Sequence, residues 1–237
     1  MVNIWSYFAQ IIGSGCALCR APADGLCRAC LDAALPRNLH PCPGCALPLP
    51  DGAPVHTLCA ACQARAPSFD RAFAPLLYTA PLDDLIAGFK YHRRLPLGRI
   101  LGRVLAQTLV DRPGRPQLLL PVPATPDRLR ERGFNQAAEL ARTLAVHLDI
   151  AWTTRRLHRT RDAGPQRGLT RRERRRNLHG AFACRGPLPP HVALVDDVIT
   201  TGTTAEEASR ALKEAGAERV EVWAVARTPL EAADLES

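Results

Sequence analysis

Two adjacent carboxylates and a threonine-rich turn stand together near the end of the chain. Residues 192–208 read VALVDDVITTGTTAEEA. The four apolar residues predict a buried strand, and Asp196 and Asp197 follow at its carboxyl end, where open α/β sheets bind ligands. The turn after them leads into a predicted helix, so hydroxyls, backbone N–H groups and the helix dipole converge there. The segment predicts an anion site at Thr200, Thr201, Gly202, Thr203 and Thr204.

The combination of acids and an anion site narrows the class of ligand. Carboxylates repel phosphate, but they hold sugar hydroxyls or Mg²⁺. A ligand with a phosphate at one end and a diol at the other satisfies both halves, and ribose 5-phosphate is such a ligand. A nucleotide P-loop needs Gly-Lys-Ser/Thr and a dinucleotide site needs Gly-x-Gly-x-x-Gly, and the segment has neither. The structural alternative is a capping box from Thr204 to Glu207, which leaves the two acids unexplained.

Eight of the nine cysteines form four Cys-x-x-Cys pairs in the first quarter of the chain. This spacing is typical of structural zinc, and two Cys₄ sites in succession predict a double zinc ribbon that holds two Zn²⁺. An interleaved assignment of the pairs is equally compatible with the spacing. Thioredoxin-like redox chemistry fits less well, because no βαβ pattern surrounds the pairs. The first predicted site is Cys16, Cys19, Cys27 and Cys30, and the second is Cys42, Cys45, Cys59 and Cys62.

Positive charge is concentrated in one stretch of the chain. Residues 155–176 contain ten arginines against Asp162 and Glu173, whereas the whole chain has a formal net charge of +8. Guanidinium groups fork onto two phosphate oxygens, so the stretch suits phosphate or a nucleic-acid backbone. The alternative is a solvated loop, which is how most charge runs behave.

Apolar periodicity predicts an α/β domain behind the cysteines. Predicted strands cover residues 71–78, 117–122, 150–153, 192–195 and 220–226, and predicted helices cover residues 81–91, 96–110, 135–148 and 203–215. Strands that alternate with helices indicate a parallel sheet. We divide the chain into a metal-binding module, residues 1–65, and an α/β domain, residues 70–237. The apolar stretch 4–12 is too short to span a bilayer, and paired thiols without a signal peptide favour the cytoplasm.

Several short motifs together resemble the ComF family (competence protein F, also called GntX-like), whose main domain is a type I phosphoribosyltransferase. The resemblance covers nearly the whole chain in the expected order. It rests on the cysteine pairs, Phe89-Lys90-Tyr91, Pro121-Val122-Pro123, the stretch 130–136 (RERGFNQ), Gln166, Leu169, Arg174, Asn177, Gly180-Ala181-Phe182 and residues 192–204.

The resemblance implies a role for each part of the motif. Asp196 and Asp197 would bind the ribose hydroxyls of a phosphoribosyl pyrophosphate-type ligand, directly or through Mg²⁺, and residues 200–204 would wrap the 5-phosphate. Arg128, Arg130 and Arg132 would face the pyrophosphate, and the arginine-rich stretch would close over the ligand as a hood. The family implies either phosphoribosyl transfer to an unknown acceptor or a role in DNA uptake. The latter would involve single-stranded DNA and DNA-uptake proteins.

Overall fold

The computed structural model describes residues 15–92, 94–160 and 180–229. Its centre is a parallel six-stranded sheet in the order β1-β8-β7-β3-β4, with β2 also pairing with β8. The strands are β1 (Arg71–Phe73), β2 (Leu76–Leu77), β3 (Leu118–Pro121), β4 (Ala151–Trp152), β7 (His191–Ile199) and β8 (Arg219–Arg227). The predicted α/β class with a parallel sheet is confirmed.

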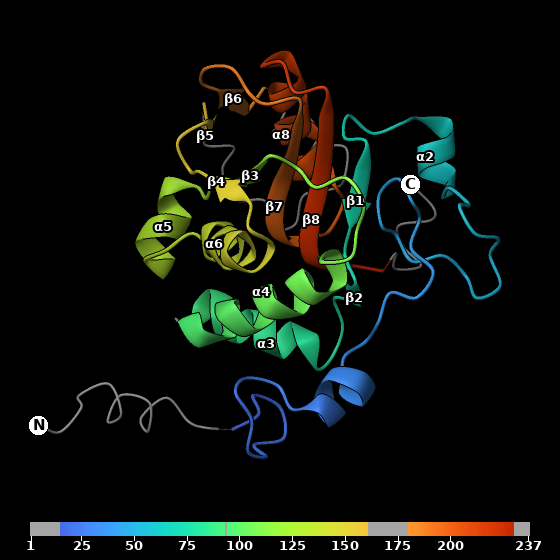
Figure 1. Cartoon of the computed structure of the whole chain (residues 1–237), viewed down its shortest axis with the longest axis vertical. Helices are drawn as coiled ribbons and strands as arrows, with labels where there is room; N and C mark the ends of the chain where they lie inside the picture. Colours follow the sequence, from blue (N-terminus) through green and yellow to red (C-terminus); the bar gives the residue numbers. More distant parts are fainter. Residues whose placement is uncertain (1–14, 93, 161–179, 230–237) are drawn as a thin grey trace, which may run out of the picture.

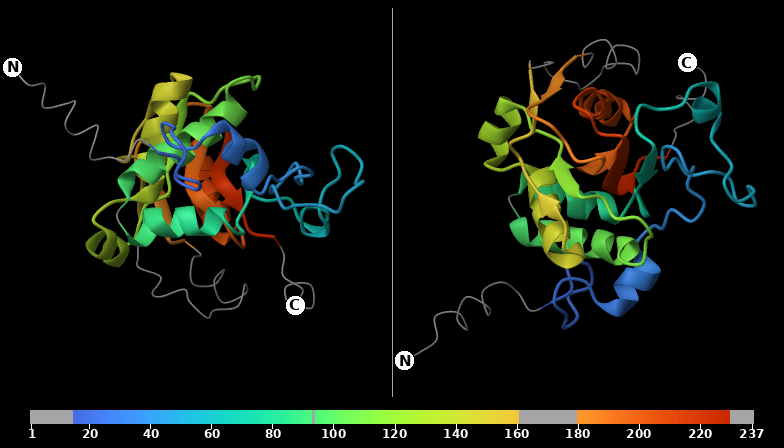
Figure 2. Two further views of the ribbon diagram at one scale, coloured as in Figure 1. Left: turned by 90° about the horizontal axis from the view of Figure 1, so that it is seen from below. Right: turned by 45° about the horizontal axis from the view of Figure 1, so that its top comes forward.

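Helices cover both faces of the sheet (Figures 1 and 2). One face is covered by α3 (Leu82–Tyr91), α4 (Leu95–Leu109) and α6 (Gln136–Leu148), and the other by α8 (Thr203–Glu214). The two cores follow the alternation of side chains along a strand. In β7, Ala193 and Val195 belong to the first core, whereas Val192 and Leu194 belong to the second.

Three features of the domain differ from the sequence prediction. The strand predicted at 71–78 is divided into β1 and β2, with Pro75 between them; proline has no N–H to donate to β8, and its carbonyl accepts the Asn38 N–H at 2.8 Å. Strand β7 extends to Ile199, beyond the predicted end at 195. Residues 157–159 and 182–184 form a separate antiparallel pair, β5 (Leu157–Arg159) and β6 (Phe182–Cys184).

A short helix, α5 (Pro126–Arg132), was also not predicted. Its local signals are nevertheless complete. The Thr125 side chain accepts the Arg128 N–H, Pro126 lies in the first turn, and Gly133 ends the helix with a φ of 81°. Such signals were too short-ranged to stand out beside the longer amphipathic helices.

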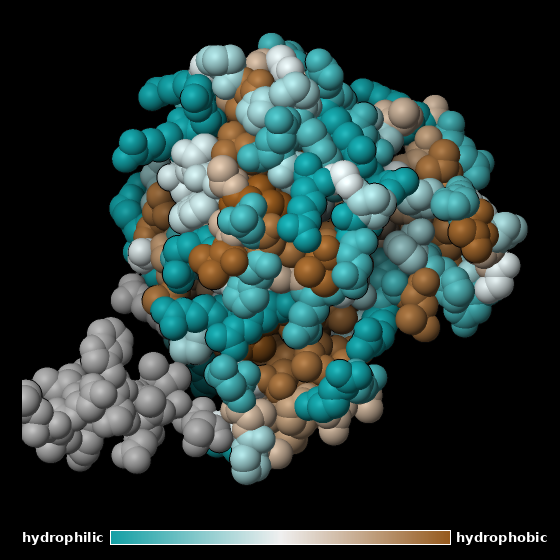
Figure 3. All heavy atoms as spheres, in the orientation of Figure 1, coloured by the Kyte–Doolittle hydropathy of each residue, from teal (hydrophilic) through white to brown (hydrophobic). Residues whose placement is uncertain are grey.

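The two cysteine segments lie at separate places on the domain (Figure 1). Cys16 and Cys30 belong to the core of the α3 and α4 face, and Cys30 begins a short helical turn (Cys30–Ala34). The second segment includes α2 (Ala60–Ala64) and places Ala46 in the core of the α8 face. Apolar patches lie on the surface of this part of the molecule (Figure 3), where Leu39 and Val55 are exposed.

Some predictions fall outside the described residues. They concern the apolar stretch at 4–12 and the part of the arginine-rich stretch at 161–179. Among the residues that the structure describes, no helix combines the length and hydropathy that a membrane crossing requires.

Candidate functional site

A cavity of about 530 Å³ opens at the carboxyl ends of β3 and β7. The chain leaves these two parallel strands toward opposite sides of the sheet. Strand β3 is followed in the sheet by β4 at one edge, and β7 is followed by β8 on the other side. Such a switch point is where open parallel sheets bind ligands. The lining is Tyr78, Lys90, Tyr91, residues 122–125, Asp127, Arg128, Glu131, Arg132, residues 135–137, Arg159, residues 196–198, Thr200 and Thr204.

Asp196 and Asp197 lie at the floor of the cavity, on the last part of β7. Strand β3 ends at Pro121, opposite Val195, so both acids lie beyond the last residue of the neighbouring strand. The Asp197 N–H donates to Asp196 Oδ1 at 2.8 Å. Burial raises the pKa of Asp196 to about 7, and the nearby Asp197 charge adds to this effect. The two carboxylates therefore favour a cation or hydroxyl donors between them.

Lys90 on α3 already supplies one such cation. Its Nζ lies 3.0 Å from Asp197 Oδ1 and 5.9 Å from the centre of the Tyr78 ring. Burial by itself lowers the pKa of Lys90, but the charge and hydrogen bond of Asp197 together with the charge of Asp196 outweigh burial, so the pKa lies above its usual value. The sequence analysis included Lys90 in a family motif without assigning it to the site. The available signal was its rarity, since Lys90 and Lys213 are the two lysines of the chain.

The threonine-rich turn forms the second wall of the cavity. Gly202 is the N-cap of α8 with a φ of 79°, so the cap residue has no side chain, and the Thr203 N–H donates to Thr201 Oγ1 at 3.4 Å. Thr200 and Thr204 line the cavity, whereas Thr201 and Thr203 pair their hydroxyl oxygens at 2.9 Å behind it. A helix N-terminus whose cap residue is glycine leaves further backbone N–H groups of the first turn available to an anion.

The capping-box alternative for this turn is wrong. Glu207 is buried and does not turn back to the first residue of the helix. Its carboxylate instead accepts the Gly180 N–H at 3.3 Å and pairs with Arg210 at 3.2 Å. The helix begins at Thr203 with Gly202 as its N-cap, two residues earlier than a cap at Thr204 requires.

The third wall is the segment from Val122 to α6, and it separates the three predicted arginines. Arg128 and Arg132 line the cavity, whereas Arg130 pairs with the exposed Asp127 at 2.7 Å and does not line it. Arg132 is buried and its guanidinium lies 5.0 Å from the Tyr91 ring centre.

Arg132 and Gln136 hold each other in this wall. Arg132 Nη1 donates to Gln136 Oε1 at 2.9 Å, while Arg132 Nε and Gln136 Nε2 have no hydrogen-bond partner among the residues that the structure describes. Buried donors without a partner are rare in folded proteins. Within the described part of the chain, these two donors leave the wall with unused hydrogen-bonding capacity.

Arg159 on β5 also lines the cavity and was not singled out by the sequence analysis. Its Nε donates to the Pro123 carbonyl at 3.0 Å, and its guanidinium lies 4.7 Å from the Phe182 ring centre. These contacts join the antiparallel β5–β6 pair to the loop after β3. Arg159 was hidden among ten arginines, and its position depends on a pairing that the sequence pattern did not reveal.

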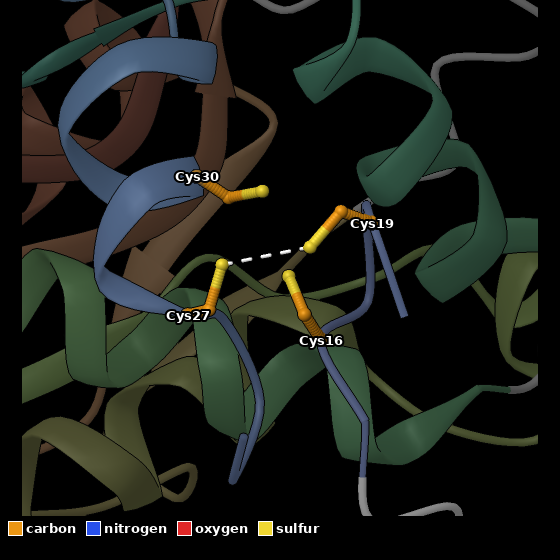
Figure 4. Close-up of side chains that lie close together, drawn as sticks. All are labelled: Cys16, Cys19, Cys27 and Cys30. Atoms are coloured by element: carbon orange, nitrogen blue, oxygen red, sulfur yellow. Dashed lines mark hydrogen bonds between the residues drawn. The ribbon is translucent and has the colours of Figure 1, made fainter. Parts of the chain in front are cut away.

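The cysteines gather into the two groups that the sequential assignment predicts. Within each group the four sulfur atoms lie within 4.8 Å of one another. Tetrahedral zinc with Zn–S bonds of about 2.3 Å separates its sulfurs by roughly 3.8 Å. Figure 4 shows the first group, in which Cys19 and Cys27 Sγ are 3.5 Å apart. Both groups can hold zinc, and Cys184 belongs to neither among the described residues.

Two thiols of the second cysteine group have pKa values that are shifted in opposite directions. A hydrogen bond with Cys62 lowers the pKa of Cys45 to about 5 although burial opposes this, and the same bond raises the pKa of Cys62. Thiols this close cannot all ionise unless a cation compensates them, which is what a bound dication does.

The comparisons with known proteins agree with this fold and site. Residues 129–235 match the family model described as phosphoribosyl transferase domain. These residues include both acids, the threonine-rich turn and the last strands of the sheet. The fold and the site therefore define a phosphoribosyltransferase-type domain.

Relatives cover the cysteine segments as well. The DNA utilization protein YhgH of Salmonella typhimurium is 35% identical over 90% of this chain and 96% of that protein. Competence protein F of Haemophilus influenzae is 36% identical over 71% of this chain and 78% of that protein. The chain belongs to the ComF family of competence protein F and YhgH, as the resemblance predicted.

Proposed function

We propose that the cavity binds the 5-phosphoribosyl part of a phosphoribosyl pyrophosphate-type ligand together with Mg²⁺. The observation that carries the proposal is the joint position of three groups. Two acids, the N-terminus of α8 and a wall with two arginines border one cavity of about 530 Å³. A ligand with a phosphate, a diol and a second anionic group satisfies all three.

Each wall then has one task. Thr200 to Thr204 hold the 5-phosphate through backbone N–H groups and hydroxyls. Arg128 and Arg132 face the pyrophosphate, because both border the cavity. Arg130 can join them after it leaves Asp127. Arginine suits this role because its fork binds two oxygens at once.

The acids fit Mg²⁺ by their chemistry. Mg²⁺ prefers carboxylate oxygens and retains several waters. Among the described residues Asp196 forms no ion pair, whereas Asp197 is already paired with Lys90. Asp196 and Asp197 would therefore hold the ion or the ribose hydroxyls with unequal strength. When bound, Mg²⁺ would neutralise the charge of the pyrophosphate group.

Calorimetric titration with phosphoribosyl pyrophosphate tests this proposal. We expect binding that requires Mg²⁺ and that ribose 5-phosphate competes for. Binding that is equally strong without Mg²⁺, or absent with it, contradicts the proposal. Release of pyrophosphate during incubation with candidate acceptors would identify a transferase, and tight binding without release would identify a binding protein.

A second candidate function is binding of single-stranded DNA, in cooperation with DNA-uptake proteins. It is favoured by the names of the relatives, a DNA utilization protein and a competence protein, and by the arginine-rich stretch at 155–176. Phosphate contacts make affinity fall with salt, by about one unit of logarithmic slope per contact. We expect neutralisation of Arg172 and Arg176 to flatten that slope while binding of the small ligand survives. If the slope is unchanged and binding of the small ligand is lost, the arginine-rich stretch serves only as a hood over the small ligand.

We propose a division of labour between residues 1–65, which bind zinc, and residues 70–237, which bind the ligand. The free thiols of the two groups fit a reducing compartment, so we place the protein in the cytoplasm.

A further inference from the structure

Arg227, the last residue of β8, lies between the second cysteine group and the threonine-rich turn. It is buried, and its Nη1 donates to the carbonyls of Ile199 at 3.0 Å and Thr228 at 3.1 Å. The same nitrogen also donates to the Thr200 carbonyl. One guanidinium therefore contacts two carbonyls of the backbone that enters the turn, beside the Thr228 N–H that donates to the Ile199 carbonyl at 3.0 Å.

The same guanidinium reaches the metal-binding segment. Its Nε donates to the carbonyl of Cys45 at 3.2 Å. Cys45 thus has two roles: its sulfur belongs to the second cysteine group, and its carbonyl accepts a bond from Arg227. A metal that fixes the Cys45 sulfur also fixes the Cys45 carbonyl, because both belong to one residue of a short turn, the knuckle at residues 42–45.

Other contacts of the second segment lead to the same part of the domain. The Ala72 N–H donates to the Gly44 carbonyl at 2.8 Å, which joins the knuckle to β1. Beyond the last cysteine, the Ser68 N–H and hydroxyl donate to Glu206 at 2.8 and 2.9 Å. Glu206 lies in the first turn of α8, directly after the threonine-rich turn.

The first cysteine group provides a natural contrast. It packs against α4, where Asp24 pairs with Arg103 at 2.8 Å and Gly25 lies against Ile100. None of its described contacts reaches residues 199–206. The chain therefore carries two similar metal sites, of which one is joined to the turn.

We propose that Arg227 is a positioning residue that couples metal occupancy of the second cysteine group to the shape of the phosphate-binding turn. Metal at this group holds the Cys45 carbonyl, Arg227 remains anchored to it, and the Ile199 and Thr200 carbonyls keep the turn ready for the ligand. The effect on ligand affinity rests on the proposed function. The effect on the turn itself does not.

Matched cysteine variants test the coupling. Cys62→Ser disables the second group and Cys27→Ser disables the first, and zinc content verifies that each loses one equivalent. We expect Cys62→Ser to speed amide hydrogen exchange of residues 198–206 and to weaken binding of phosphoribosyl pyrophosphate with Mg²⁺ by about tenfold, within the usual range of coupling between sites. Cys27→Ser should leave exchange of these residues unchanged. Equal exchange of the turn in both variants overturns the proposal.

Variants of Arg227 separate positioning from general stability. Lysine keeps the charge but replaces the planar fork with a single ammonium, so Arg227→Lys should speed exchange of residues 198–206 while both zinc ions stay bound. Arg219→Gln removes a paired arginine from the other end of β8 and serves as the control for lost stability. If both variants speed exchange of the turn equally at a matched melting temperature, Arg227 has no positioning role.

Non-additivity and reciprocity complete the test. If Arg227 carries the coupling, Cys62→Ser should change the turn less in the Arg227→Lys background than in the wild type. Coupling is also mutual, so phosphoribosyl pyrophosphate with Mg²⁺ should slow zinc loss to a chelator from one of the two sites. Full additivity overturns the proposal. If the wild type binds no phosphoribosyl pyrophosphate, the proposed function fails, and the exchange measurements still decide the role of Arg227.

Discussion

At the scale of residues, the site is governed by an excess of negative charge at the end of β7. Asp196 and Asp197 are adjacent, both border the cavity, and Lys90 compensates one of them at 3.0 Å. Burial raises the pKa of Asp196 to about 7, which means that it disfavours the charged carboxylate. A purely structural position gains nothing from such a carboxylate. Strongly shifted groups in a cavity are typical of functional sites. The chemistry of these side chains thus agrees with a ligand role.

Asparagine in place of either acid should weaken ligand binding more than it lowers the stability of the fold. Asp196→Asn and Asp197→Asn each remove a charge that faces the cavity, so we expect Mg²⁺-dependent affinity for phosphoribosyl pyrophosphate to fall by about tenfold or more, since a hydrogen bond to a charged group contributes roughly 1.5–3 kcal/mol. Calorimetry measures the affinity, and thermal melting measures the fold. Unchanged affinity in both variants would remove the ligand from this part of the cavity, and loss of folding would assign the acids a structural role.

Lys90 should depend on Asp197 for its contribution to stability. Lys90→Met leaves Asp197 partly buried without its partner, and a double-mutant cycle with Asp197→Asn should give a coupling of about 1–2 kcal/mol. Both side chains are less than one-fifth exposed, so screening by water is limited. Denaturant unfolding of the four proteins measures the coupling. A coupling near zero would mean that the pair contributes nothing beyond two independent residues.

At the scale of elements, the turn between β7 and α8 is the device that presents the helix N-terminus. Its conformation depends on Gly202, whose φ of 79° is costly for any residue with a side chain. A Cβ there would meet nothing within 4 Å, so crowding plays no part in the requirement for glycine. The backbone conformation alone accounts for it.

Substitution of Gly202 should therefore follow backbone preference. Gly202→Ala should lower the free energy of unfolding by about 1–2 kcal/mol, whereas Gly202→Asn should cost less, because asparagine tolerates the left-handed region better. Chemical denaturation of both variants is the measurement. Equal costs would contradict a backbone origin and point to an interaction of the added side chain.

At the scale of the whole molecule, the α/β fold carries two cysteine groups that can hold zinc, and they lie on different sides. The first joins the α3 and α4 core through Cys16 and Cys30, and the second joins the α8 core beside the turn. Metal sites of this kind contribute folding free energy that is lost with the metal. Because the knuckles pack on different cores, their losses should have different consequences.

Metal analysis should find two zinc ions per chain. The eight thiols of the two groups bind them, and Cys184 lies outside both groups, so Cys184→Ser should leave the count at two. Mass spectrometry under native conditions and thiol titration before and after acid release measure this. A count near zero, or disulfides in protein from freshly lysed cells under non-oxidising conditions, would overturn the zinc assignment.

The sequence by itself determined the local order of the site and the class of the fold. Apolar runs, helix caps and the succession of strand, acids, turn and helix depend on residues that are neighbours in the chain. Their spacing therefore predicted β7, the turn and α8. The Cys-x-x-Cys pairs predicted the two cysteine groups. Even there, β7 proved longer than predicted, because hydrogen bonds to β8 extend the strand through Ile199, whereas α8 begins at Thr203 as predicted.

Only the tertiary structure decided which distant groups meet at the site. Lys90 reaches Asp197 because α3 lies on the face toward which that side chain points, and Arg227 reaches Cys45 because β8 ends beside the second knuckle. The packing of α5 also decided that the side of this helix with Arg128 and Arg132, and not the side with Arg130, borders the cavity. These contacts join elements far apart in sequence, and hydrophobic periodicity specifies which face of an element is buried without specifying what it is buried against.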